Sequence, residues 1–521
     1  MEEHSNKDLI VGIDAGTSVI KAVAFTVGGY QIGAAARTNR YVTGEDGRVE
    51  QSMTQTWADT ASALQVLAEN VKGLASRTAA IGVTGQGDGT WLVDRQGDPV
   101  GNAWLWLDSR AALLTERLSH AETDPDRFAA TGTGLNTCQQ GAQMAYMDQH
   151  DPALLDRART ALHCKDWLYY QLTGVLATDP SEASFTFGNF RTRDYDSTVI
   201  NALGLTHRRS LLPPILEGTA AGHPLSREAA NATGMRAGTP VSLGYVDMVM
   251  SALGAGLHTG EAGTACSAIG STGVHLQSRT TDQVVLNRER TGYSICLPVA
   301  GQVAQVQTNM AATLNIDWML DVMAGLLEEF GQSPTRCDLM THLDVWLQQT
   351  TPAEILYHPY ISEAGERGPF LNARARAGFI GLSARHGFKD MLRGVVDGIA
   401  LAAADCYAVM GGTPRELRLS GGAVRSPMLR ASLAAAVGAP VRVCSRDEAG
   451  AAGCAMMAAV SIGAYPDMDA CVADWVVPLL GEAEPPDSSI MERYQILLSA
   501  YREAREAMPP VWARLANNKG A

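Results

Sequence analysis

The stretch from Asp14 to Lys21, with the sequence Asp-Ala-Gly-Thr-Ser-Val-Ile-Lys, combines residue types that bind phosphate groups. Gly16 leaves the backbone N–H groups uncrowded, Thr17 and Ser18 add hydroxyl donors, and Lys21 adds a cation. Asp14 can hold a divalent metal ion or its water ligands. Apolar runs on both sides predict that this stretch is the turn of a β-hairpin. An ordinary hairpin, in which the glycine and threonine serve only the turn, remains the alternative.

A second turn of the same kind lies in the other half of the chain. The run Ala268-Ile-Gly-Ser-Thr-Gly-Val274 again places small and hydroxyl residues between apolar segments, here Gly270, Ser271 and Thr272. The two turns are about 255 residues apart, which suggests a duplicated architecture. A nucleotide would then lie between the two halves.

Two acidic residues follow predicted strands and are candidates for contact with a substrate. Asp88 follows the strand 79–84 within Gly85-Gln86-Gly87-Asp88-Gly89, and ligands of α/β domains sit beyond such strand ends. Asp247 ends the apolar strand 241–247, where its carboxylate can accept the proton of a substrate hydroxyl group. Alternatively, Asp247 only caps the helix predicted over 248–256.

The elements that position these residues alternate between strands and helices, which predicts an α/β protein. Helical periodicity covers 54–74, a mostly helical insertion covers 125–240, and a charged helix covers about 489–508. Asp108 or Ser109 is expected to cap a helix that runs to Ser119. The strand 417–420 enters a Gly-Gly turn before the helix 427–437, and such a turn lets the backbone approach a flat ligand.

Bulk composition narrows the class of protein. A chain of 521 residues with 46% hydrophobic and 18% charged residues predicts two or more globular domains. The net charge of −14 argues against nucleic acid and anionic membranes as partners. The Ala-rich stretches 394–410 and 449–465 are expected to be buried helices. Nine scattered cysteines and a polar N-terminus favour a reduced, cytoplasmic protein.

Taken together, many short motifs in register resemble those of the FGGY family of carbohydrate kinases. The order matches from about residue 8 to about residue 465, nearly the whole chain. The motifs are Asp14-x-Gly-Thr-x-x-x-Lys21, Gly85-Gln86, Trp106-x-Asp108-x-Arg110, Lys165-Asp166-Trp167 with Leu172-Thr173-Gly174, Gly244 to Asp247, Gly270 to Gly273, Gly365-Glu366-Arg367-x-Pro369, Gly378 to Leu382, Gly421-Gly422-Ala423 and Glu448-Ala449-Gly450.

This resemblance implies two actin-like (ribonuclease H-like) α/β domains, in a hexokinase-type ATPase fold with ATP, Mg²⁺ and the sugar in the interdomain cleft. The domains would span residues 7–255 and 256–515, and homodimers are common among relatives. By carry-over, Asp247 matches the catalytic base and, with Asp14, lies near the metal ion. Positions matching substrate contacts are Gln86, Asp88, Trp106 and Asp247. Positions matching nucleotide contacts are Gly16, Thr17, Ser18, Lys21, Gly270, Ser271, Thr272, Gly422, Ala423 and Ser426.

Departures from the family pattern bear on the substrate. Many pentulose kinases of the family have Gln-Met-His-Gly where this chain has Gln86-Gly87-Asp88-Gly89. A site that offers the carboxylate of Asp88, and fewer contacts to a sugar ring or keto group, suits a short linear polyol. Within the family, the run Gly85 to Trp91 is most similar to that of bacterial kinases that convert erythritol to erythritol 4-phosphate. Within the same family, the alternative is a kinase that acts on L-xylulose or D-xylulose.

A protein of a different class also remains open, because actin-like folds include nucleotide switches that phosphorylate no small molecule. The polar set Gln86, Asp88 and Asp247 favours the kinase, since a switch does not need it. Among the tryptophans Trp91, Trp104 and Trp106, only Trp106 is expected at the substrate. Isolated histidines such as His163 show no metal-ligand spacing and are expected to be structural or surface residues.

Overall fold

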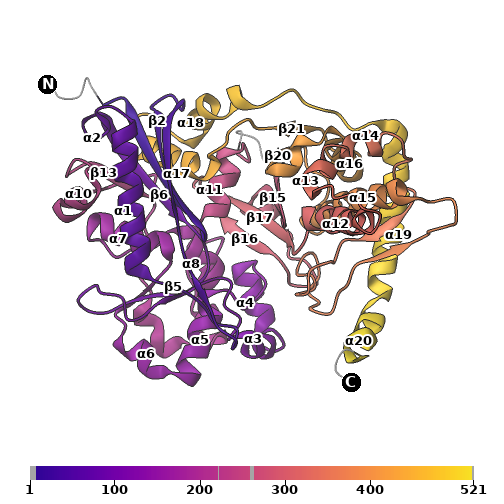
Figure 1. The fold of residues 1–521 in the computed structure, drawn as a ribbon. Helices are drawn as coiled ribbons and strands as arrows, with labels where there is room; N and C mark the ends of the chain where they lie inside the picture. The colour runs from indigo at the N-terminus through magenta and orange to yellow at the C-terminus, as the bar shows by residue number, and fades with distance from the viewer. Residues whose placement is uncertain (1–6, 221, 259–262, 519–521) are drawn as a thin grey trace.

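The structure is a computed structural model that describes residues 7–220, 222–258 and 263–518 (Figure 1). Two α/β halves lie side by side, the N-terminal one in indigo to magenta and the C-terminal one mainly in pink and orange. Each half contains a six-stranded mixed sheet. The predicted class, a two-domain α/β fold, is confirmed.

The N-terminal sheet has the strand order β12-β13-β6-β1-β2-β3. Its strands are β1 (Leu9–Ala15), β2 (Val19–Thr26), β3 (Gln31–Thr38), β6 (Thr78–Gly85), β12 (His223–Pro224) and β13 (Pro240–Leu243). β1 runs antiparallel to β2 and parallel to β6, which in turn is parallel to β13. The predicted hairpin is therefore confirmed: Gly16, Thr17 and Ser18 form its turn, and Asp14 pairs with Lys21 across it.

The C-terminal sheet has the order β16-β17-β15-β14-β20-β21 and repeats this topology in five of its strands; its sixth strand, β16, lies at the edge opposite to that of β12. Its strands are β14 (Thr264–Ile269), β15 (Gly273–Thr280), β16 (Tyr293–Cys296), β17 (Gln302–Asn309), β20 (Glu416–Ser420) and β21 (Val441–Val443). β14 is antiparallel to β15 and parallel to β20, as β1 is to β2 and β6. The predicted duplication is thus present, and residues 270–272 form the equivalent hairpin turn.

The predicted helical insertion in the N-terminal half is also confirmed. The helices of this half are α1 (Met53–Asn70), α2 (Leu74–Arg77), α3 (Ala112–Ser119), α4 (Asp124–Thr131), α5 (Gln140–His150), α6 (Pro152–Arg157), α7 (Cys164–Thr173), α8 (Pro180–Phe187), α9 (Ser197–Ala202), α10 (Arg227–Thr233) and α11 (Asp247–Gly254). Short strands join them: β4 (Val42–Thr43), β5 (Val49–Gln51), β7 (Trp91–Val93), β8 (Ala103–Trp104), β9 (Thr160–Leu162), β10 (Gly188–Asn189) and β11 (Asp194–Tyr195). Much of the insertion packs around its own apolar core.

The helices of the C-terminal half include both Ala-rich stretches. They are α12 (Thr313–Glu328), α13 (Arg336–Met340), α14 (Leu343–Leu347), α15 (Phe388–Val409), α16 (Pro427–Val437), α17 (Ala449–Ser461), α18 (Met468–Trp475), α19 (Ser488–Ala507) and α20 (Pro509–Asn518), with the short strands β18 (Leu356–His358) and β19 (Gly378–Ile380). As predicted, α15 and α17 are largely buried. Among the described residues, no helix combines the length and apolar character needed to cross a membrane.

Helix α17 returns from the C-terminal half to pack against β1 and β6 of the N-terminal sheet. A Cβ atom added at Gly12 would lie 2.0 Å from the carbonyl oxygen of Ala451, and one at Gly82 would lie 2.1 Å from that of Cys454. Only glycine permits this approach, because a side chain would push the helix off the sheet. Together with α11, α17 belongs to an apolar core that includes residues of both sheets.

Two local predictions were wrong. The strand expected to reach Asp247 ends at Leu243, because the Val246 N–H donates to Ser181 Oγ (3.1 Å) instead of continuing the sheet. The expected helix cap at residues 108–109 is absent: α3 begins at Ala112 without a side-chain cap. Asp108 instead accepts hydrogen bonds from the Val49 N–H and from Arg110.

Candidate active site

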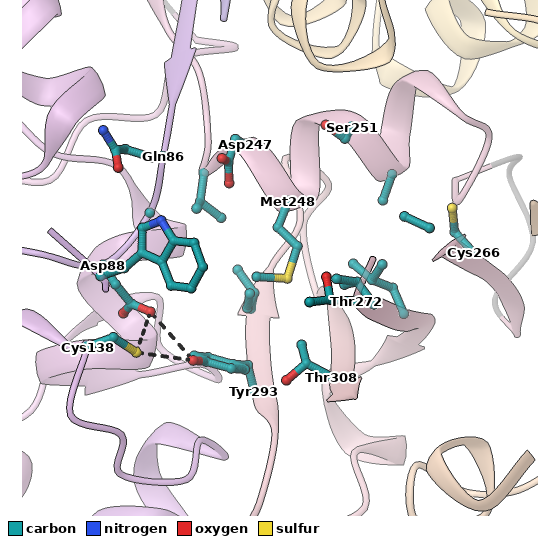
Figure 2. A pocket seen from close by; sticks show the side chains of 18 of the residues that line it. Gln86, Asp88, Cys138, Asp247, Met248, Ser251, Cys266, Thr272, Tyr293 and Thr308 are labelled. Carbon is teal, nitrogen blue, oxygen red and sulfur yellow. Dashed lines mark hydrogen bonds between the residues drawn. The ribbon is translucent and has the colours of Figure 1, made fainter. Parts of the chain in front are cut away.

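A cavity of about 380 Å³ lies between the two halves of the molecule. Six of the predicted site residues line it: Thr17, Gln86, Asp88, Trp106, Asp247 and Thr272. Thr17 comes from the first hairpin turn and Thr272 from the second, so both predicted phosphate-binding turns reach the same cavity. Figure 2 shows Asp247 and Asp88 at separate positions along the wall that the N-terminal half contributes.

Asp247 is the first residue of α11. Burial raises the pKa of its carboxyl group to about 7, and the charge of Asp14 contributes to the increase. A carboxylate with such a pKa can accept a proton near neutral pH. The alternative role as a helix cap is not what the structure shows, because Val246 occupies the cap position and no side-chain capping hydrogen bond is formed.

Asp14 lies at the end of β1, next to the N-terminus of α17. Burial raises its pKa to about 6; the charge of Lys21 opposes this shift and that of Glu448 adds to it. Lys21 itself forms an ion pair with Glu448 (2.8 Å). A Cβ atom added at Gly450 would lie 2.2 Å from Asp14 Oδ2, so the glycine makes room for this carboxylate.

Asp14 and Asp247 together are suited to a divalent cation. Both carboxyl groups are desolvated and repel each other, and the nearby Lys21 is engaged with Glu448. In the described part of the chain, no group of three or more His, Cys, Asp or Glu side chains is placed to hold a metal. Two carboxylates nonetheless match the way Mg²⁺ is held when substrate phosphates supply further ligands.

A hydrogen-bond network joins the first hairpin turn to the substrate wall. Trp106 Nε1 donates to Thr17 Oγ1 (2.9 Å), which donates to Gln86 Oε1 (3.0 Å). Gln86 Nε2 in turn donates to Gln51 Oε1 (2.8 Å). Trp106 is thus placed at the cavity as predicted, while Trp91 is completely buried in the N-terminal core.

Asp88 lies in a tight turn and adopts a left-handed backbone conformation, with φ of 55°. Its Oδ2 accepts hydrogen bonds from Cys138 Sγ (3.2 Å) and Tyr293 OH (3.5 Å) (Figure 2). Its Oδ1 is buried and has no hydrogen-bond partner among the residues that the structure describes. Burial raises the pKa of this carboxyl group. A substrate hydroxyl group would supply the missing donor.

Beneath the cavity lies a buried network of charged residues. Lys165 contacts Asp166 (2.6 Å) and Asp179, and His163 bridges Asp166 (3.1 Å) to Glu182 (3.4 Å). Asp179 accepts from Ser181, whose Oγ receives the Val246 N–H. His163 is therefore structural, as expected. The network fixes the backbone immediately before Asp247, and it includes residues of α8.

The remaining predicted nucleotide residues do not line the cavity; they are Gly16, Ser18, Lys21, Gly270, Ser271, Gly422, Ala423 and Ser426. Gly270 and Ser271 directly precede Thr272. The carbonyl oxygen of Gly270 accepts a hydrogen bond from the Thr313 N–H, and that of Ser271 accepts one from the Ala312 N–H, at the start of α12. Gly422 and Ala423 belong to a short 3₁₀ turn, and the side chain of Ala423 is outside the described part of the structure.

Ser426 has a structural role in the fold. It caps α16 by accepting from the Leu429 N–H (3.1 Å), and its hydroxyl donates to Asp344 Oδ1 (2.6 Å). By contrast, Ser420, at the end of β20, lines the cavity and was not predicted.

Among the further side chains at the cavity that were not assigned a role from the sequence are Cys138, Tyr293 and Arg367. Arg367 lies in the Gly-Glu-Arg-x-Pro motif. The sequence analysis identified this motif as one of the family but gave Arg367 no role in binding. Tyr293 and Cys138 carry no local signal, because only the tertiary structure brings them to Asp88.

Comparisons with known proteins agree with this architecture. Residues 9–254 match the N-terminal domain, and residues 265–462 the C-terminal domain, of the FGGY family of carbohydrate kinases. The chain is 62% identical to an erythritol kinase of Brucella abortus (strain 2308), over 98% of each chain. It is 28% identical to a xylulose kinase of Escherichia coli (strain K12), over 97% of this chain and 100% of the relative.

Solved structures share the fold at lower identity. A xylulose kinase from Lactobacillus acidophilus superposes with a TM-score of 0.87 at 18% identity, over 97% of this chain and 99% of that one. A glycerol kinase from Plasmodium falciparum superposes with a TM-score of 0.80 at 17% identity, over 95% and 98%. With both family domains in sequence order and a cavity between them, the chain belongs to the FGGY family of carbohydrate kinases.

Proposed function

We propose that this protein is an ATP-dependent erythritol kinase, which converts erythritol to erythritol 4-phosphate in sugar-alcohol catabolism. The observation that carries the proposal is the 62% identity, along 98% of the chain, to a relative named erythritol kinase. The cavity is consistent with it. A short linear polyol offers several hydroxyl groups, and Asp247 and Asp88 offer carboxylates at separate positions.

In the proposed mechanism, Asp247 orients the reacting hydroxyl group and accepts its proton as the phosphoryl group is transferred. Asp14 and Asp247 would hold Mg²⁺, and the bound ion would neutralise negative charge on the phosphate groups. Gln86, Asp88 and Trp106 hold the substrate at the wall of the N-terminal half. The buried network that includes α8 keeps the backbone before Asp247 in place.

For the nucleotide, we propose that the two hairpin turns hold the phosphate groups from opposite sides. Gly16, Thr17, Ser18 and Lys21 would act from the first turn, and Gly270, Ser271 and Thr272 from the second. The Gly-Gly turn with Gly422 and Ala423 would lie against the adenosine. Ser426 would act there indirectly, because its hydroxyl is engaged in capping α16.

We further propose that the functional domains span residues 7–255 and 256–515, and that the protein works in the cytoplasm, where ATP is available. Eight of the nine cysteines are buried and all nine are unpaired, which suits a reducing compartment. Although α17 belongs to the second domain in sequence, it packs on the sheet of the first. This helix would therefore link the domains.

The test is a substrate panel of C3 to C6 polyols and ketoses with coupled detection of ADP. We expect erythritol to give the highest kcat/KM, with L-xylulose and D-xylulose at least about tenfold lower. A higher kcat/KM for either pentulose would overturn the assignment of substrate. ADP release that is independent of any added alcohol would instead indicate a nucleotide switch.

A further inference from the structure

We propose that Arg367 and Tyr293, both from the C-terminal half, complete a subsite at Asp88 for a hydroxyl group of the substrate distant from the one that is phosphorylated. The proposal rests on the proposed function in one respect, namely that the cavity holds a polyol. It assigns substrate contacts to a half of the molecule in which the sequence predicted only nucleotide contacts.

The first observation is the incomplete hydrogen bonding of Asp88. Within the described part of the chain, its Oδ1 is buried without a partner, and its Oδ2 accepts only from a thiol at 3.2 Å and a phenol at 3.5 Å. A buried carboxylate oxygen without a donor is costly, so such an atom indicates a place for a ligand group. Asp88 lines the cavity that also contains Asp247.

The second observation is the position of Arg367. This side chain lines the same cavity, and its charge acts on Asp88, Cys138 and Tyr293. The described residues include no carboxylate within ion-pair distance of it; its Nε donates only to the sulfur of Met310. An arginine with most of its five donors available is suited to bind hydroxyl oxygens beside an acceptor carboxylate.

The backbone of Arg367 is held firmly, which makes it suitable for recognition. The buried carboxylate of Glu366 accepts the N–H groups of Met310 (2.9 Å) and Arg367 (2.9 Å) through Oε1. Met310 directly follows β17, so the arginine is tied to the end of an interior strand of the C-terminal sheet. A binding group on a rigid support loses little conformational entropy when the ligand binds.

The third observation is that Tyr293 enters the substrate wall of the other half. It begins β16 in the C-terminal sheet, yet its hydroxyl lies 3.5 Å from Asp88 Oδ2, 3.4 Å from Asn136 Nδ2 and 3.7 Å from Cys138 Sγ. Its ring packs edge-on against Phe185, with centroids 5.6 Å apart. Figure 2 shows the Asp88, Cys138 and Tyr293 contacts as a closed triangle.

These observations give the subsite an acceptor from one half and donors from the other. A hydroxyl group between Asp88 and Arg367 would donate to Asp88 Oδ1 and accept from the guanidinium group. The reacting hydroxyl group lies at Asp247, so the subsite recognises a different position along the polyol. Binding there would favour the conformation in which the two halves are close, because only that conformation has both partners.

The test compares two substrates in two variants. Erythritol is compared with the enantiomers of erythro-butane-1,2,3-triol, which lack one terminal hydroxyl group. With Arg367→Met, we expect kcat/KM for erythritol to fall about 10- to 100-fold, the range for a hydrogen bond to a charged group. For the active triol enantiomer we expect a change of less than about threefold, because its missing hydroxyl group already leaves the subsite empty.

The matched control is Arg374→Met, which removes an exposed arginine of the same loop and should leave both substrates unchanged. Arg367→Lys keeps the charge and should restore part of the loss, and Tyr293→Phe should reduce kcat/KM for erythritol about three- to tenfold. Equal losses for both substrates in Arg367→Met, or unaltered erythritol kinetics, would overturn the subsite. If the wild-type protein phosphorylates no polyol, the proposed function itself fails, and the two failures are thereby distinguished.

Discussion

At the scale of single residues, the proposed chemistry depends on two acids whose pKa values are raised by burial. Burial raises the pKa of Asp247 to about 7 and that of Asp14 to about 6, and the charge of Asp14 further disfavours ionisation of Asp247. A cation between them would reverse this effect and lower both pKa values. The protonation state of the base is therefore expected to depend on the metal ion as well as on pH.

This dependence gives a first prediction about pH. Because Asp247 must be deprotonated to act as the base, kcat/KM for the polyol should fall with unit slope as pH decreases below about 7 at limiting Mg²⁺. Saturating Mg²⁺ should shift the acidic limb to lower pH. The measurement is kcat/KM between pH 5.5 and 8.5 at two Mg²⁺ concentrations. An acidic limb that does not move with Mg²⁺ would argue against a metal ion at these two carboxylates.

The second prediction concerns Asp247→Asn. Without the base, kcat should fall by at least about 10²–10³-fold, while the Kd for ATP changes little. Isothermal titration with ATP is the control that the variant is folded. Near-normal turnover would remove Asp247 from the mechanism.

The same variant should be more stable at alkaline pH. The folded-state pKa of Asp247 lies above its ordinary value of 3.8, so ionisation costs folding free energy as pH rises from about 4 to about 7. The amide has no such cost. Thus the Tm of the variant should exceed that of the wild type at pH 8, by an amount corresponding to on the order of 2 kcal/mol. The difference should largely disappear at pH 4.

At the scale of elements, the close packing of α17 on the N-terminal sheet depends on glycines. The third prediction is that Gly82→Ala lowers the free energy of unfolding by about 1–3 kcal/mol, because the new Cβ would lie 2.1 Å from a helix carbonyl oxygen. Activity should fall too, since α17 begins beside Asp14. Urea unfolding and kcat report the two effects.

Gly325→Ala is the matched control for this prediction. Gly325 lies within α12, is exposed, and has no atom within 4 Å of an added Cβ. Because alanine restricts the unfolded chain and favours helix, this change should stabilise the protein by about 0.5–1 kcal/mol. A loss of stability at Gly325 equal to that at Gly82 would show that packing of α17 is not the cause.

The elements also show what the sequence can predict. Both hairpin turns, α15 and α17 follow from local patterns of apolar, glycine and hydroxyl residues, and all were predicted. Helix α8 lies within the insertion that was predicted to be mostly helical, but its bounds do not follow from periodicity, because its apolar and polar residues alike are buried. Asp108 failed as a predicted cap because a distant partner, the Val49 N–H, competes for its carboxylate.

For the site, the residues predicted at the cavity are those next to turns and strand ends. Tyr293 and Arg367 could not be assigned in this way. Tyr293 contacts Asp88, and Arg367 lines the same cavity, only because the two halves meet there; this placement follows from tertiary packing rather than from local sequence.

At the scale of the whole molecule, the two halves contribute matching parts to one cavity. Thr17 lies at the end of one sheet and Thr272 at the end of its structural repeat. Phosphoryl transfer requires that water be excluded while both turns hold the phosphates. Since neither half can enclose the substrates alone, closure of the halves around ATP and polyol is the expected step before transfer.

The last prediction tests this closure with a complex that cannot react. Asp247→Asn should bind ATP with Mg²⁺ and erythritol together without turnover, so the ternary complex can be studied by small-angle X-ray scattering. The radius of gyration should decrease most with both ligands and less with either one, because ATP connects the halves at the phosphate turns, erythritol connects them at Asp88 and Arg367, and the two connections add. Arg367→Met added to this variant should weaken the compaction caused by erythritol but not that caused by ATP. An unchanged radius of gyration in the ternary complex would show that the halves are already as close in the free protein as the reaction requires.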